Sequence, residues 1–97
     1  MTYLISNKLN KYLNDEKCIR KHYGNLSDAI TFSISVLVGA DCLALVPNVP
    51  PTRRHKLSDG NWALDLNKNW RMIIRPLDGD SPENIKSIEI IDIVDYH

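Results

Sequence analysis

A β-hairpin across residues 62–75 is the feature that most constrains the fold of this chain. Apolar residues alternate there with polar or small ones on both sides of Asn67-Lys68-Asn69, as expected for two strands that each bury one face. Asparagine also tolerates the backbone angles of a tight turn. Alternation places Arg71 and Arg75 opposite Trp70, so the second face of the sheet presents guanidinium groups. A solvated sheet surface would explain these two arginines equally well.

Length and composition place the hairpin in one ordinary globular domain. The chain has 97 residues, enough for one hydrophobic core, so residues 1–97 are expected to form a single domain. No apolar run approaches the ~18 residues of a membrane span, and the N-terminus lacks a basic start followed by a long apolar run, so a cytoplasmic protein is expected. Cys18 and Cys42 stand alone, and we expect two reduced core residues rather than a disulfide or a metal pair.

Two helical regions are expected before the hairpin. Residues 9–13 have helical spacing, Asn14 is expected to cap a second helical segment, and Gly24 is expected to end it. Another helix is expected from residue 25 to residue 39. Residues 30–38 nevertheless alternate between apolar and polar side chains, and this pattern alone favours a strand.

The C-terminal residues 85–96 predict the last strand because they are rich in β-branched side chains. Apolar residues occur at both odd and even positions of this segment. Such a pattern indicates a central strand that is covered on both faces. The same alternation places Asp95 and His97 on one side of the strand end.

Charge is unevenly distributed although the formal net charge is zero. Residues 53–75 contain six basic and two acidic residues, whereas residues 78–95 contain six acidic residues and one lysine. A basic middle followed by an acidic segment can mark a surface that binds a polyanion. Ionic pairing between neighbouring strands would produce the same distribution.

Sequence motifs give no support to metal or nucleotide-cofactor chemistry. The chain has no HExxH, paired Cys/His spacing, P-loop, GxGxxG or GxSxG, so neither a metal nor a cofactor is expected. Its histidines are His22, His55 and His97. Imidazole, carboxylate, phenol and basic groups suit metal-free RNA cleavage, in which a base takes the 2′-hydroxyl proton, an acid protonates the leaving oxygen and cations stabilise the phosphate. Most small proteins contain a few such residues, so this indication is unspecific.

Five stretches carry a resemblance that composition does not reveal. They are NKLNKYLNDEKCIRKHYG, RRHKL, NWALDL, NWRMIIRP and IEIIDIVDYH, of which the terminal VDYH is the most specific. On these residues nearly the whole chain resembles a HigB-type toxin, the plasmid maintenance system killer protein, of the RelE/ParE toxin superfamily. The resemblance implies an α+β, RelE-like fold with two N-terminal helices packed on one face of an antiparallel β-sheet and the active site on the other. It also implies that residues 30–38 are helical.

The resemblance further implies a toxin of a type II toxin-antitoxin module. Similar family members enter the decoding site of the ribosome, cleave messenger RNA without metal and so inhibit translation. The implied partners are the ribosome, mRNA and a HigA-like helix-turn-helix antitoxin, with no membrane and no small-molecule cofactor.

Matching motif by motif, the resemblance assigns site residues. Asp95 and His97 are the candidates for proton transfer, Arg71 would stabilise the phosphate, and Tyr96 would stack on a base or orient the phosphate. His55 takes the place of the family's histidine before the hairpin. RNA backbone contacts are expected from Arg53, Arg54, Lys56 and Arg75.

One departure from the family leaves two alternatives open. The segment HKLSDGNW is shorter than the family pattern and lacks its Gly-Asp-Arg arginine, which would weaken or abolish cleavage. One alternative is therefore a decayed toxin that only binds its antitoxin. The other is a gyrase-inhibiting toxin of the ParE branch, against which the terminal Asp-Tyr-His argues because that role needs no terminal acid and base.

Overall fold

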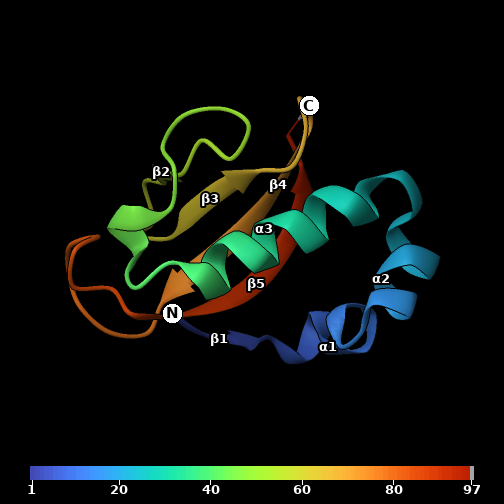
Figure 1. The fold of residues 1–97 in the computed structure, drawn as a ribbon, viewed down its shortest axis with the longest axis horizontal. Coiled ribbons are helices and arrows are strands. Elements are labelled where there is room, and N and C mark those ends of the chain that lie inside the picture. Colours follow the sequence, from blue (N-terminus) through green and yellow to red (C-terminus); the bar gives the residue numbers. More distant parts are fainter. Residues whose placement is uncertain (97) are drawn as a thin grey trace.

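A computed structural model describes residues 1–96 as a layer of helices on one five-stranded sheet (Figure 1). The helices are α1 (Asn7–Leu13), α2 (Glu16–Tyr23) and α3 (Ser27–Gly39), with short 3-10 turns η1 (Gly24–Leu26) and η2 (Leu43–Leu45). The strands are β1 (Thr2–Ile5), β2 (His55–Lys56), β3 (Trp62–Asp65), β4 (Trp70–Pro76) and β5 (Ser87–Asp95). The predicted α+β arrangement is confirmed.

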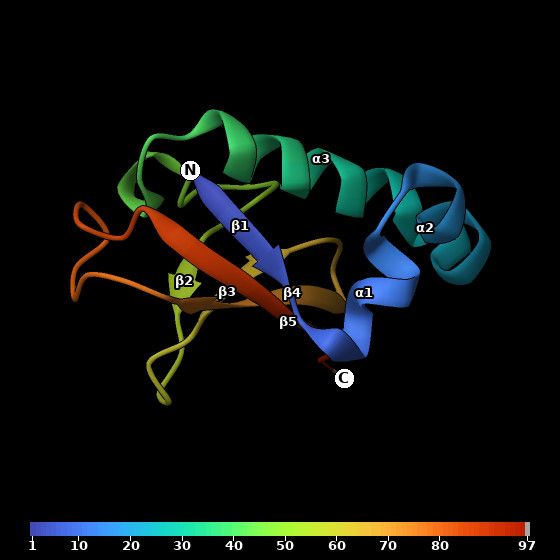
Figure 2. The same cartoon turned by 90° about the horizontal axis from the view of Figure 1, so that it is seen from below.

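The sheet has the strand order β1-β5-β4-β3-β2 and is antiparallel except at one edge. There β1 pairs in parallel with β5, with Thr2 opposite Ser87. The sequence did not predict β1, because a four-residue strand gives little periodicity and its partner is far away in the chain. Figure 2 shows α3 lying along one face of the sheet, and within residues 1–96 no helix lies on the opposite face.

The segment with alternating residues is helical, as the resemblance implied. In α3 the buried positions are Ser27, Ile30, Ser33 and Leu37, which follow the spacing of one helix face rather than the period of a strand. Tertiary packing of this stripe against the sheet therefore overrides the β-branched composition. The helix begins at Ser27, directly after η1, and Leu26 occupies its N-cap position without a side-chain hydrogen bond. The expected start at residue 25 is thus two residues early.

The first helical region divides where a break was expected, but another residue caps the second part. The carboxylate of Asp15, not the side chain of Asn14, accepts a hydrogen bond from the backbone N–H of Cys18 at 2.8 Å. This bond lowers the pKa of Asp15. Gly24 ends α2 with a φ of 53°, as predicted, because glycine adopts positive φ without a steric penalty. Cys18 and Cys42 are both free thiols.

The predicted hairpin is present as β3 and β4. The side-chain oxygen of Asn67 closes its turn by accepting from the backbone N–H groups of Asn69 and Trp70, each at 2.8 Å. On the helix-covered face the hairpin contributes Leu64, Met72 and Ile74, which are fully buried against α1, α2 and α3. Burying one such side chain contributes about 1.5–3 kcal/mol to folding.

A β-bulge in β5 corrects one sequence-based expectation. The pairing of β5 with β4 passes from Ile74–Ile90 to Ile73–Asp92, which skips Ile91. One extra residue reverses the faces of all residues that follow, so Ile90 and Ile93 both reach the core. Apolar residues at odd and even positions therefore reflect the bulge, not a strand covered by helices on both faces.

Within residues 1–96 no helix has the length and apolar character needed to cross a membrane.

Candidate functional site

The uncovered face of the sheet carries a group of four side chains, Arg53, Asp65, Arg71 and Tyr96, here called the arginine cluster. The hairpin register places Asp65 directly opposite Arg71. Arg53 approaches from the loop before β2, and its Nε donates to Asp65 Oδ2 at 2.6 Å while Nη2 donates to Oδ1 at 3.3 Å. Arg71 Nε lies 3.1 Å from the same Oδ1. A single carboxylate thus bridges two guanidinium groups.

Arg71 is held firmly but is incompletely hydrogen-bonded. Its side chain is 16% exposed, and its guanidinium carbon lies 4.4 Å from the centroid of the Tyr96 ring, within the range of a cation–π interaction. Nε is close enough to Asp65 for an ion pair, yet neither Nε nor Nη1 forms a hydrogen bond to any described residue although both atoms are buried. Buried donors without acceptors are rare and call for a functional explanation.

His55 joins the arginine cluster through the backbone of Arg53. Arg53 has a φ of 45°, which is unusual for a residue with a side chain. Its carbonyl oxygen lies 2.7 Å from Nδ1 of His55. Because a carbonyl can only accept, Nδ1 carries the proton, and in the neutral ring Nε2 keeps its lone pair. His55 pairs with Ala63, which shares its face of the sheet with Asp65, so this basic nitrogen belongs to the same uncovered face.

The electrostatics of the cluster favour an anion. Two guanidinium groups face one carboxylate, which leaves an excess of positive charge. The hydrogen bond and the charge of Asp65 raise the pKa of Arg53, so Arg53 stays charged at any physiological pH. Tyr96 is 50% exposed, and an exposed aromatic ring can stack on a nucleobase.

The end of β5 presents Tyr96, and not Asp95, to Arg71. Asp95 pairs with Trp70 in the sheet, and Trp70 packs on the helix-covered face, so the strand directs Asp95 away from Arg71. The following residue, Tyr96, reaches Arg71, and its backbone N–H donates to the carbonyl of Asn69 at 2.6 Å. His97 lies outside the described residues, so its predicted role and its predicted side of the strand remain untested.

Three of the residues predicted to hold RNA backbone lie away from the cluster. Arg54 packs over the ring of Trp62 at 5.2 Å and donates to the carbonyl of Val46 at 2.9 Å, which indicates a structural role. Lys56 is exposed and pairs with Trp62, so it lies on the other face of its strand. Arg75 is on the uncovered face but pairs with Glu89 at the far end of β4.

Sequence reasoning missed Asp65 as a site residue. Its position in the hairpin alternation already placed it on the face of Arg71, and a hairpin closed at Asn67–Asn69 brings the two residues opposite each other. The signal was therefore present, but no role was assigned to Asp65 from the stretch NWALDL.

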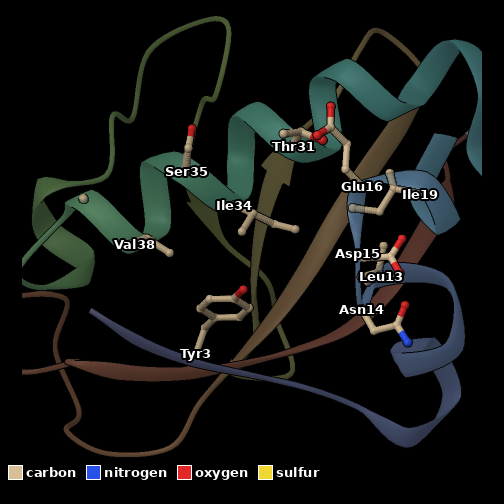
Figure 3. A pocket seen from close by; sticks show the side chains of 11 residues that line it. Tyr3, Leu13, Asn14, Asp15, Glu16, Ile19, Thr31, Ile34, Ser35 and Val38 are labelled. Atoms are coloured by element: carbon tan, nitrogen blue, oxygen red, sulfur yellow. The ribbon is translucent and has the colours of Figure 1, made fainter.

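A second feature is an apolar groove on the helix side of the molecule, here called the helix groove (Figure 3). In the figure Tyr3 of β1 points toward Ile34 of α3, while Asp15 and Glu16 stand at the α1–α2 end. The groove encloses about 450 Å³, and no arginine or lysine lines it among the described residues. Its lining residues are Tyr3, Leu13, Asn14, Asp15, Glu16, Ile19, Thr31, Ile34, Ser35, Val38 and Gly39.

These features define what the two surfaces can do chemically. The arginine cluster offers an anion a guanidinium donor that lacks an acceptor among the described residues, together with a ring for stacking and a histidine whose Nδ1 donates to a carbonyl. Such groups can bind a phosphodiester and accept a proton from a hydroxyl beside it. Within residues 1–96 no cluster of three or more metal-ligating side chains occurs. The helix groove offers apolar contact with an acidic end.

Comparison with known proteins places the fold. No protein-family model matches the chain. No curated protein matches its sequence. A solved structure described as a YoeB/ParE toxin from Agrobacterium tumefaciens superposes with a TM-score of 0.59 and 14% identity, covering 100% of this chain and 99% of that one. The two proteins therefore share a fold over their full length.

Proposed function

We propose that this protein is a toxin of a type II toxin-antitoxin module that cleaves messenger RNA on the ribosome. The HigB-type resemblance of the sequence motifs and the fold shared with a YoeB/ParE toxin both support a toxin. The observation that carries the proposed activity is Arg71: its guanidinium is stacked on Tyr96, and its Nη1 has no acceptor among the described residues. A phosphodiester would supply the acceptor that Nη1 lacks.

In the proposed reaction a 2′-hydroxyl of the RNA is the nucleophile, and protein side chains transfer the protons. Nε2 of His55 takes the proton of a 2′-hydroxyl, and the oxygen attacks the neighbouring phosphorus to form a 2′,3′-cyclic phosphate. The bond to the 5′-oxygen breaks, and His97 supplies the proton that this leaving oxygen requires. Arg71 stabilises the negative charge that accumulates on the phosphate, while Tyr96 stacks on a flanking base.

We further propose that the helix groove is where a HigA-like antitoxin docks. The groove and the arginine cluster lie on opposite faces of the sheet, so a bound antitoxin would leave the proposed RNA site uncovered. The lining is mostly apolar and ends at Asp15 and Glu16, which suits an amphipathic segment with a basic residue at one end.

Cleavage on programmed ribosomes tests the proposed function. Purified protein, mRNA-programmed ribosomes and mapping of the new RNA ends should show cuts in the decoding site, with a single-turnover rate roughly 10²–10⁴-fold lower for His97→Ala. Addition of a chelator that binds transition metals should leave the rate unchanged.

Two outcomes would favour the alternatives. A protein that does not cleave RNA but inhibits gyrase supercoiling would be a ParE-like toxin. A protein that binds the antitoxin but neither cleaves RNA nor inhibits gyrase would be a decayed toxin. Full cleavage by His97→Ala would remove the terminal histidine from the mechanism.

A further inference from the structure

Asp65 is the acidic residue of the arginine cluster, and it has no role in the reaction described above. It is 18% exposed and lies on the face proposed to meet RNA, where a carboxylate repels phosphate. Both of its oxygens face guanidinium groups, Oδ2 at 2.6 Å from Arg53 Nε and Oδ1 at 3.1 Å from Arg71 Nε. A proton acceptor needs a free lone pair in the right direction, so Asp65 is poorly placed to act as a base.

Asp65 contacts Arg71 at Nε and leaves Nη1 without an acceptor in the part of the chain that the structure describes. The carboxylate approaches the Nε atom, while Nη1 is buried and forms no hydrogen bond to any described residue. Tyr96 covers one face of the same guanidinium plane. Contacts at one atom and one face fix the orientation of a planar group, so the Nη atoms keep a constant direction.

The same carboxylate holds the side chain of Arg53, and the backbone of Arg53 in turn holds His55. Its guanidinium makes two hydrogen bonds to Asp65, and its backbone carbonyl fixes Nδ1 of His55. Arg53 holds a positive φ, a conformation that surrounding contacts must maintain. The fork to Asp65 is one such contact.

We propose that Asp65 is a positioning residue that aligns Arg71 and, through Arg53, His55 for phosphodiester cleavage. This inference rests on the proposed function. Asp65 touches neither the RNA nor the reacting atoms in this proposal, and it acts through the two arginines. Its negative charge weakens RNA binding slightly, in exchange for a fixed geometry.

Asp65→Asn tests this role because the amide keeps the shape and removes the charge. At saturating ribosomes the single-turnover rate should fall roughly 10- to 100-fold, the range found when a group that orients a reactive residue is lost. The ribosome concentration that gives half the maximal rate should stay equal or decrease, since a repulsive charge is gone. Glu89→Gln is the matched control, because Glu89 also pairs with an arginine on this face, Arg75, and should leave both values unchanged.

A readout that needs no RNA separates this proposal from the proposed function. In arginine side-chain NMR spectra, Asp65→Asn should remove the protected Nε–H signal of Arg53 and shift that of Arg71, while the signal of Arg75 stays in place. If wild-type protein fails to cut RNA while Asp65→Asn still causes these spectral changes, the proposed function is overturned and the coupling is retained.

Three results would overturn the positioning role. An unchanged rate would show that the arginines need no alignment. A faster rate would show that Asp65 blocks the anion site. Loss of rate in proportion to loss of folded protein, with unchanged spectra at Arg71, would show that Asp65 only stabilises the fold.

Discussion

The arginine cluster and the helix groove lie on opposite faces of one sheet and are built on opposite principles. The cluster consists of charged side chains held by one another and by the register of β3 and β4. The groove consists of apolar side chains that continue the hydrophobic core to the surface. Removal of Arg71 from the cluster should therefore change chemistry more than stability, because Asp65 keeps its two hydrogen bonds to Arg53 and is not left as an unpaired charge. Substitutions in the groove should instead change partner binding.

The sharpest test of this contrast is Arg71→Ala. We expect the single-turnover cleavage rate to fall roughly 10²–10³-fold, as on removal of one donor that stabilises transition-state charge. The midpoint of thermal unfolding should change little, since Arg71 lies on the face opposite Met72 and the core. Leu64→Ala is the control for a true core truncation, which typically costs 2–5 kcal/mol in unfolding free energy. An unfolding midpoint lowered as much by Arg71→Ala as by Leu64→Ala would make the arginine structural.

A charge placed in the helix groove should change antitoxin binding and not cleavage. Val38 lines the groove and is 54% exposed, so Val38→Lys should leave folding and cleavage unchanged. It should weaken antitoxin binding roughly tenfold or more, because the ammonium group would lose its water in an apolar contact.

The matched control is Val49→Lys, since Val49 is 59% exposed and does not line the groove. Isothermal titration with the antitoxin compares the two variants. Equal affinities for Val38→Lys, Val49→Lys and wild type would place the antitoxin elsewhere. Hydrogen-exchange protection centred on Arg71 in the complex would place it on the arginine cluster.

The smallest effect is expected at the end of the groove, where Asp15 caps α2. The pKa of Asp15 is lowered in the folded state by the backbone N–H of Cys18, so the ionised form stabilises the fold. This stabilisation is present above the ordinary carboxyl pKa near ~4 and is lost as the pH falls through the lowered folded-state value. Asp15→Ala should therefore lower the unfolding midpoint by a few degrees at pH 7.

Thermal unfolding between pH 7 and pH 2 measures this dependence. The gap between wild type and Asp15→Ala should close on acidification, and Asp80→Ala, at an exposed loop position, should show no such gap. A gap that stays constant with pH would assign the effect of Asp15 to something other than its charge. Unchanged cleavage by Asp15→Ala would confirm that the two faces act separately.

Much of the candidate site could be predicted from the sequence, because local alternation and motif resemblance both pointed to it. Alternation placed Arg71 on the face opposite Trp70, and the register confirms this. Asp65 was overlooked because its proposed positioning role depends on two arginines, and one of them, Arg53, comes from a separate loop. That Tyr96, and not Asp95, reaches Arg71 could not be anticipated, since the bulge at Ile91 sets the face of both residues and leaves no clear mark in the sequence.

The sequence by itself determined the hairpin, its turn at Asn67 and the end of α2 at Gly24, because these depend on backbone preferences and on period-2 patterning within a few residues. Only the tertiary structure decided that residues 30–38 are helical, that β1 joins β5 in parallel, and that Asp65 bridges two arginines. Each of these depends on contacts between segments far apart in the chain. The free energy of such contacts comes from burial and charge pairing, which local propensities do not encode.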